Sequence, residues 1–195
     1  MNDQLFEQLA DATPLTQEER EGLTPSYITL RHELNEAEQA NIIEAGEWAF
    51  ARKRNVLDDS FLHRLHKRMF GNVWKWAGEI RRSGKNIGVD AYKISTELRQ
   101  LLDDTGYWIE HSTYKPDEIA ARFHHQLVFI HPYSNGNGRH ARLATDLLLV
   151  SMECPRFSWG RANLVSTGET RSAYIEALRA ADRHDYEPLM IFVRS

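Results

Sequence analysis

The spacing of apolar residues constrains the fold of this chain more than any other feature of its sequence. After residue 25, apolar side chains recur three or four positions apart along most of the chain, a period typical of helices that bury one face. Capping residues, a proline in one first turn and glycine stops divide this pattern into separate helices. The expected helices cover residues 35–50, 60–70, 95–111, 116–130, 143–152, 168–182 and 185–194.

This pattern predicts an all-α fold with one exception. Asn35 and Glu38 have the spacing of a capping box, which places the start of the first long helix at Asn35. Residues 143–152 are apolar most of the way round, so we expect them to form the central helix of the core. Glycines interrupt the helical period in EIRRSGKNIGV, residues 79–89, and this segment predicts a short β-hairpin.

Length and composition favour one domain. The 195 residues suffice for a single domain with a sizeable core. Residues 1–25 are polar and indicate an N-terminal arm with at most a short helix, which leaves residues 26–195 as the domain. The formal charge of −4 gives no broad attraction to nucleic acids or acidic membranes. With Cys154 as the only cysteine, no secretory signal and no long apolar run, we expect a cytoplasmic protein without a membrane partner.

The densest chemistry lies in HPYSNGNGRHAR, residues 131–142. Its glycines allow backbone N–H groups to approach a ligand closely, and the segment opens into a helix whose first N–H groups favour an anion. Arg139 and Arg142 lie one turn apart and would face the same anion, which favours a polyphosphate over a single carboxylate. The segment is not a Walker A loop, because no Gly-Lys-Ser/Thr follows the glycines. A plain helix-start turn with two solvated arginines is the alternative for such a short pattern.

The full string closely resembles the motif of the Fic family, His-Pro-Phe-x-Asp/Glu/Asn-Gly-Asn-Gly-Arg-x-x-Arg. The resemblance covers roughly residues 28–192, and the N-terminal TPLTQEEREGLTPSYITLRHELNEAEQ looks like the subgroup called mobile mystery protein B. It implies a Fic-type helical bundle with a small β-hairpin flap. It further implies a protein adenylyltransferase that uses ATP and Mg²⁺ to move AMP onto a Ser, Thr or Tyr hydroxyl of an unidentified target protein. Self-modification and a homodimer are further possibilities within the family.

The resemblance also implies roles for single residues of the motif. His131 would be the general base that takes the proton of the target hydroxyl. Asn135 stands at the acidic position and would hold Mg²⁺ through its amide oxygen. Tyr133 would anchor the loop in the core. The remaining motif residues would bind ATP, with Arg142 on the γ-phosphate: Gly136, Asn137, Gly138, Arg139 and Arg142.

Outside the motif, the resemblance assigns three more groups. The hairpin would be the flap that aligns the target, with Lys85, Asn86, Ile87 and Gly88 at its ligand-facing edge. The nucleoside pocket would be built with Tyr174, Ile175 and Asp182. Thr29 to Asn35 resemble the family's inhibitory helix, here residues 26–35, in which Glu33 would pair with Arg142 and block the γ-phosphate.

Other interpretations stay open at this point. The transferred group could be UMP, phosphocholine or phosphate, since the motif specifies phosphate chemistry better than the base. The chain could also be a catalytically silent nucleotide-binding regulator, or an antitoxin-like partner in a mobile-element module. His63 and His66 lie one turn apart but lack a third metal ligand, so we expect a surface pair.

Overall fold

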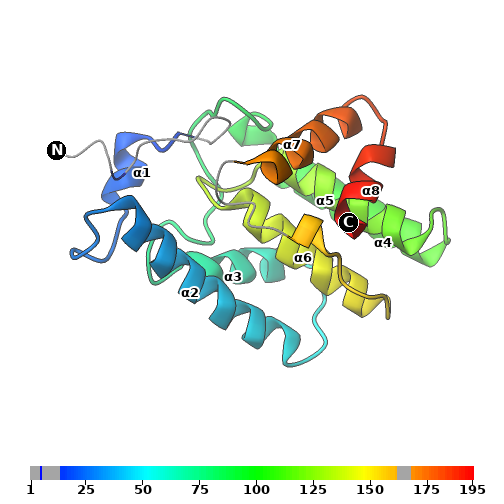
Figure 1. Ribbon diagram of the computed structural model, residues 1–195, viewed down its shortest axis with the longest axis horizontal. Coiled ribbons are helices and arrows are strands. Elements are labelled where there is room, and N and C mark those ends of the chain that lie inside the picture. Colours follow the sequence, from blue (N-terminus) through cyan, green and yellow to red (C-terminus); the bar gives the residue numbers. More distant parts are fainter. Residues whose placement is uncertain (1–4, 6–13, 162–167) are drawn as a thin grey trace.

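The computed structural model describes residue 5 and residues 14–161 and 168–195. The first part of the predicted arm, residues 1–4 and 6–13, therefore lies outside the described residues. The described chain is helical, as Figure 1 shows, and contains no strand in these ranges beyond an isolated antiparallel bridge between Leu23 and Trp74. The predicted all-α class is confirmed.

The helices follow the sequence pattern closely. They are α1 (Gln17–Glu21), α2 (Arg31–Phe50), α3 (Asp59–Phe70), α4 (Ile94–Glu110), α5 (Pro116–Ile130), α6 (Asn137–Ser151), α7 (Glu169–Ala181) and α8 (Glu187–Arg194), with short 3₁₀ turns at Ala91–Lys93 and Trp159–Arg161. No helix in the described part of the chain is long and apolar enough to cross a lipid bilayer.

The start of α2 differs from the prediction. The helix begins at Arg31, because the Glu33 carboxylate accepts hydrogen bonds from the backbone N–H groups of Thr29 and Leu30 and so satisfies donors of the first turn. Asn35 therefore caps nothing, and Glu38 is a buried residue of the helix interior. The predicted capping box is wrong.

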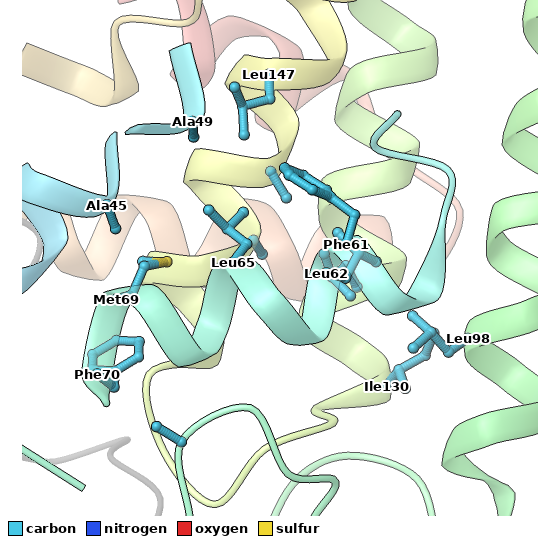
Figure 2. Close-up of a cluster of buried hydrophobic side chains, with 14 of the residues drawn as sticks. Ala45, Ala49, Phe61, Leu62, Leu65, Met69, Phe70, Leu98, Ile130 and Leu147 are labelled. Carbon is cyan, nitrogen blue, oxygen red and sulfur yellow. The ribbon is translucent and has the colours of Figure 1, made fainter. Parts of the chain in front are cut away.

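The core is built around α6, as predicted for its apolar sequence. In Figure 1, α6 lies between α2 and α3 on one side and α5, α7 and α8 on the other. Its buried side chains contribute to both hydrophobic clusters of the domain. Figure 2 shows Phe61 and Leu65 of α3 directed toward Leu147 of α6 and the small residues Ala45 and Ala49 of α2. These contacts hold the C-terminal half of α6 against α3 and α2.

The predicted β-hairpin does not form. Residues 79–90 are an irregular loop, which we call the 79–90 loop. The carbonyl groups of Ser83 and Val89, which a ladder would have paired with backbone N–H groups, accept hydrogen bonds from the guanidinium of Arg81 instead. A side chain thus closes the loop in place of strand pairing, and glycine and polar residues supply little of the cross-strand packing that stabilises a hairpin.

Candidate active site

The motif forms the connection between the end of α5 and the start of α6. His131 follows α5 in the left-handed conformation, with φ 55° and ψ 60°, and the chain then turns through Gly136 into Asn137, the first residue of α6. Gly136 has φ 78°, and a Cβ there would lie 2.5 Å from the ring of Phe70. Only glycine fits that position without strain. The loop therefore leads from His131 directly into the N-terminus of α6.

The Asn137 side chain closes the motif loop from inside. Its Oδ1 accepts a hydrogen bond from the Tyr133 N–H at 2.9 Å, and its Nδ2 donates to the Tyr133 carbonyl at 2.8 Å. Asn137 is 3% exposed, so its amide is engaged with the protein and only its backbone can face an anion. An anion at the predicted site would therefore meet backbone groups, which the Asn137 side chain holds in place.

Two histidines that were predicted to be a surface pair support this loop instead. Tyr133 is fully buried, stacks on His66 with ring centroids 3.7 Å apart, and places its hydroxyl 3.1 Å from Nδ1 of His63. The Gly78 N–H donates to Nδ1 of His66, which leaves the proton of that ring on Nε2, where it donates to the carbonyl of Asn135 at 3.0 Å. Burial lowers the pKa of His66 well below its usual value, which keeps this tautomer uncharged.

His131 is a buried, neutral imidazole. It is 6% exposed, and the backbone of the 79–90 loop lies against it, since a Cβ on Gly88 would lie 2.5 Å from the His131 Cβ. Burial is the main cause that lowers the pKa of His131, the charges of Arg81 and Lys85 add to it, and a hydrogen bond with the Val128 backbone opposes them, which leaves the pKa at about 4. At neutral pH the ring is therefore unprotonated, which is the form a general base requires.

The two motif arginines have different environments. A Cβ on Gly138 would lie 3.6 Å from Nη1 of Arg142 and 4.0 Å from the Tyr174 hydroxyl, so these predicted ligand residues do converge at the start of α6. The Tyr174 hydroxyl also lies 2.9 Å from Nε2 of the buried His124, so this tyrosine connects the start of α6 to the protein interior.

Arg139, by contrast, is held by α2. Its Nη1 donates to Oε2 of Glu38 at 2.7 Å, and its guanidinium stacks over the Phe70 ring at 4.8 Å. The other oxygen of Glu38 accepts from the Trp74 indole at 2.7 Å, and Glu38 is only 5% exposed. This buried carboxylate was not recognised as a site residue in the sequence.

The predicted pair between Glu33 and Arg142 is not formed. The Glu33 carboxylate accepts its backbone hydrogen bonds from Thr29 and Leu30 at the start of its own helix. These bonds lower the pKa of this exposed carboxyl. The carboxylate that α2 brings to the motif is Glu38, and the arginine it meets is Arg139. The correction arises because Glu33 and Glu38 lie on different sides of α2.

Asp182 and Ile175 contact residues outside the motif. Asp182 accepts a hydrogen bond from Nε2 of His125 at 2.8 Å, and Nδ1 of the same ring accepts from the Tyr186 hydroxyl at 3.2 Å. Ile175 packs against the hydrophobic cluster of α7 and α8. Within the described residues, both side chains thus have structural partners, and of the predicted nucleoside group only Tyr174 contacts a motif residue.

The 79–90 loop is tied to the arm through Lys85. This side chain is 1% exposed, donates to the Pro14 carbonyl at 2.7 Å and forms an ion pair with Glu19 of α1. Ser83 donates to the same carboxylate at 2.8 Å. Burial alone would raise the pKa of Glu19, but bonds from Lys85, Thr16, Ser83 and Ser134 outweigh it and lower the pKa to about 2. Of the predicted flap edge, Asn86 and Ile87 are exposed.

An open cavity of 770 Å³ flanks the 79–90 loop on the side of α3. Ile80, Arg82, Tyr92 and Ser95 belong to its lining, with His63.

The residues near the motif do not form a resident magnesium site. Among the described residues, no cluster of three or more His, Cys, Asp or Glu side chains could hold a metal ion. The predicted ligand Asn135 is half-buried, and its Oδ1 already accepts a hydrogen bond from the Gly136 N–H. One neutral, engaged amide oxygen is too few donors for Mg²⁺, which prefers carboxylates, phosphates and water.

Known proteins resemble this chain in sequence and in fold. Residues 56–149 match the model of the Fic/DOC family. The protein adenylyltransferase fic-1 of Caenorhabditis elegans is 30% identical over 137 residues, and the protein adenylyltransferase Fic of Drosophila melanogaster is 32% identical over 133. Each match covers 66% of this chain, but only 25% and 26% of the relative. The chain thus spans about a quarter of the length of these curated relatives.

Solved structures agree on the architecture. The BepC protein of Bartonella tribocorum, solved with bound AMPPNP, superposes with a TM-score of 0.68 at 18% identity over 92% of this chain and 97% of that one. A Fic-1 structure from C. elegans gives a TM-score of 0.66 at 24% identity, covering 89% of this chain and 51% of that one. Such identities establish the fold alone. The matched segment contains His131, the loop glycines and both arginines, and it shows that the chain carries a domain of the Fic/DOC family at residues 56–149.

Proposed function

We propose that this chain is a protein adenylyltransferase that moves AMP from ATP to a hydroxyl group of a protein. One observation carries the proposal: a neutral, buried His131 begins the glycine loop that leads into the N-terminus of α6, where Arg142 lies next to Gly138. A base and an anion site joined by one short loop suit attack of a hydroxyl on a phosphate. The relatives named protein adenylyltransferases support the same activity.

The chemistry follows from these positions. The backbone N–H groups at the start of α6 and the Arg142 guanidinium bind the phosphates of ATP. His131 takes the proton of a Ser, Thr or Tyr hydroxyl as its oxygen attacks the α-phosphorus. The new O–P bond forms while the bond from that phosphorus to the β-phosphate oxygen breaks, so AMP stays on the protein and pyrophosphate leaves. Positioning in line supplies most of the rate, as in other phosphoryl transfers.

Magnesium enters this proposal as part of the substrate. Mg²⁺ usually keeps several waters and binds through substrate phosphates, so a complex of ATP with the metal needs few protein ligands. The side-chain Oδ1 of Asn135 can supply one ligand oxygen to this metal when it gives up its hydrogen bond from the Gly136 N–H. No step of the proposed reaction requires a metal that remains on the protein between turnovers.

We also propose that α2 restrains the site, through Glu38. Arg139 and Arg142 together bring two positive charges to the motif, and the Glu38 carboxylate on Arg139 cancels one of them. A phosphate that approaches Arg139 must compete with a buried partner at 2.7 Å. The restraint is therefore expected to weaken nucleotide binding and to relax when Glu38 is neutralised.

The transferred group can be tested directly. The chain is incubated with ATP labelled on the α-phosphate or, separately, on the γ-phosphate, and the protein is analysed by intact mass spectrometry and gel autoradiography. We expect the α label to stay on protein and the γ label to leave with pyrophosphate. Retention of the γ label would indicate phosphate transfer, and stronger labelling by UTP would indicate UMP transfer. No label, while ATP still raises the melting temperature, would indicate a silent nucleotide-binding regulator.

A further inference from the structure

Arg81 is buried in the 79–90 loop and bonded only to backbone carbonyls. It is 3% exposed, and its guanidinium donates from Nε to the His131 carbonyl at 2.7 Å, from Nη1 to the Ser83 carbonyl at 2.9 Å, and from Nη2 to the Val89 carbonyl. The ion pairs found among the described residues do not include Arg81. Burial lowers the pKa of Arg81, and the charges of Glu19 and Asp90 offset only part of that effect. A buried cation without a bonded carboxylate costs stability, so its three carbonyl contacts need an explanation.

These contacts act on two parts of the site at once. The first holds the carbonyl of His131, a non-glycine residue in the left-handed conformation with φ 55°. Such a conformation persists only where the surroundings enforce it, and the backbone direction there decides where the imidazole points. The N–H of Arg81 also donates to the Pro132 carbonyl at 2.9 Å, so the same residue holds two successive peptide groups of the motif.

The other two contacts close the 79–90 loop over the histidine. Ser83 and Val89 lie on either side of the loop tip. Their carbonyl groups accept hydrogen bonds from the same Arg81 guanidinium that holds the His131 carbonyl. Gly88, next to Val89, is the residue whose backbone lies against the His131 side chain, and a Cβ there would also lie 3.0 Å from Nη2 of Arg81. The fork of five N–H donors in arginine allows this arrangement, whereas a lysine ammonium cannot span three carbonyls in one plane.

We propose that Arg81 is a positioning residue for the transfer reaction: it fixes the orientation of His131 and holds the 79–90 loop over that imidazole, without contacting ATP. This inference rests on the proposed role of His131 as general base. The charged groups that act on His131 from the loop are Arg81 and Lys85, and burial under the loop is the largest influence that lowers the pKa of His131. Opening the loop would admit water to the imidazole and raise that pKa.

The test compares Arg81→Gln with Arg82→Gln. Both remove one positive charge at adjacent positions, but Arg82 is exposed and has no hydrogen bond or ion pair within the described part of the chain. The pKa of His131 is measured by NMR on histidine-labelled protein, with the resonance assigned from His131→Ala. Activity is measured as kcat and KM for ATP, and ATP binding as a thermal shift.

We expect Arg81→Gln to raise the pKa of His131 from about 4 toward the free value of ~6.5. We expect kcat to fall by on the order of 100-fold, the usual cost of a base displaced by about 1 Å, with KM for ATP little changed. Arg82→Gln should change neither quantity. Wild-type values of both the pKa and kcat in Arg81→Gln would overturn the proposal, as would equal effects of the two substitutions.

Further variants keep the test decisive if Arg81→Gln does not fold. Arg81→Lys keeps the charge but not the fork, and Gly88→Ala displaces the loop from His131 while residue 81 remains an arginine. Both should reproduce the rise in the His131 pKa, and an unchanged pKa in both would contradict the proposal. If the wild type transfers no AMP, the proposed function fails, while the NMR titration still decides whether Arg81 controls the environment of His131.

Discussion

Neutralising Glu38 should make the protein less stable and bind ATP more tightly. In Glu38→Gln the side chain keeps its shape and can still accept from the Trp74 indole, but Arg139 loses the carboxylate at 2.7 Å. Glu38 is 5% exposed, and the side chain of Arg139 is 18% exposed, so the pair is largely buried. Removing one partner of such a pair costs about 3–5 kcal/mol, and the partial exposure of Arg139 favours the lower end.

A loss of about 3 kcal/mol corresponds to a fall in Tm of roughly 6–12 °C for a chain of this size. The freed Arg139 can then donate to a phosphate, and a charge-assisted hydrogen bond contributes about 1.5–3 kcal/mol, or roughly 10- to 100-fold in affinity. Titration of ATP followed by thermal shift measures both quantities in one experiment. The ATP-induced rise in Tm should be larger in Glu38→Gln than in the wild type, from a lower starting Tm.

The control is Glu33→Gln. Glu33 is exposed and bonds only to its own helix start in the described structure, so its neutralisation should leave ATP affinity unchanged. Weaker ATP binding in Glu38→Gln would mean that Glu38 orients Arg139 for the phosphate and does not restrain it. Tighter ATP binding in Glu33→Gln alone would refute the structural argument and restore the assignment based on the sequence motif.

Three further predictions concern protonation and metal binding. Because burial and the charge of Arg81 lower the pKa of His131 to about 4, the acid limb of kcat/KM should fall near that pH, and a limb near ~6.5 would contradict the assignment of a buried base. Asn135→Asp should lower the Mg²⁺ concentration needed for half-maximal activity, since a carboxylate binds this ion better than an amide, and an unchanged metal titration would place the ion elsewhere. The pKa of Glu19 is about 2 when folded against ~4.3 when unfolded, so its stabilisation should be complete above about pH 4.5 and lost as the pH falls toward 2. Denaturant unfolding of wild type and Glu19→Gln should therefore converge on acidification, and a constant gap would contradict the role of the Lys85 pair.

The sequence predicted the helices well because their apolar periods are long. The Pro116 start of α5 and the central position of α6 follow from local rules that tertiary contacts did not override. The motif likewise predicted that Gly138 and Arg142 lie together at the start of α6, since the first turns of a helix specify their own geometry. The subgroup resemblance and the boundary between arm and domain stay predictions.

The errors share one cause: a polar side chain whose partner is distant in the sequence. The buried stripe of α2 runs through Leu34, Glu38, Asn41, Ala45 and Ala49. A glutamate within such a stripe needs a cation, and this signal was available but was attributed to a capping box. That the cation is Arg139, 101 positions later, is information only the fold provides.

The predictions of a hairpin and of a surface pair of histidines in α3 were wrong for the same reason. No local pattern shows that Arg81 bonds the carbonyl of His131, 50 positions away, in place of a strand ladder. Similarly, His66 reaches the carbonyl of Asn135 across 69 positions. Side chains that support a site from outside its motif become visible only when the packing of α3 and the 79–90 loop on the motif is known.

The most direct test of the proposed function is transfer of the α-phosphate label by His131→Ala. The assay uses ATP labelled on the α-phosphate, with Glu38→Gln as the parent so that restraint by α2 does not hide activity. His131→Ala in this background should keep the ATP-induced rise in Tm and lose labelling by roughly 10²- to 10⁴-fold, the usual contribution of a general base. Labelling that persists at the parental rate in His131→Ala would contradict the account, because AMP would then reach protein without the imidazole at the head of the motif.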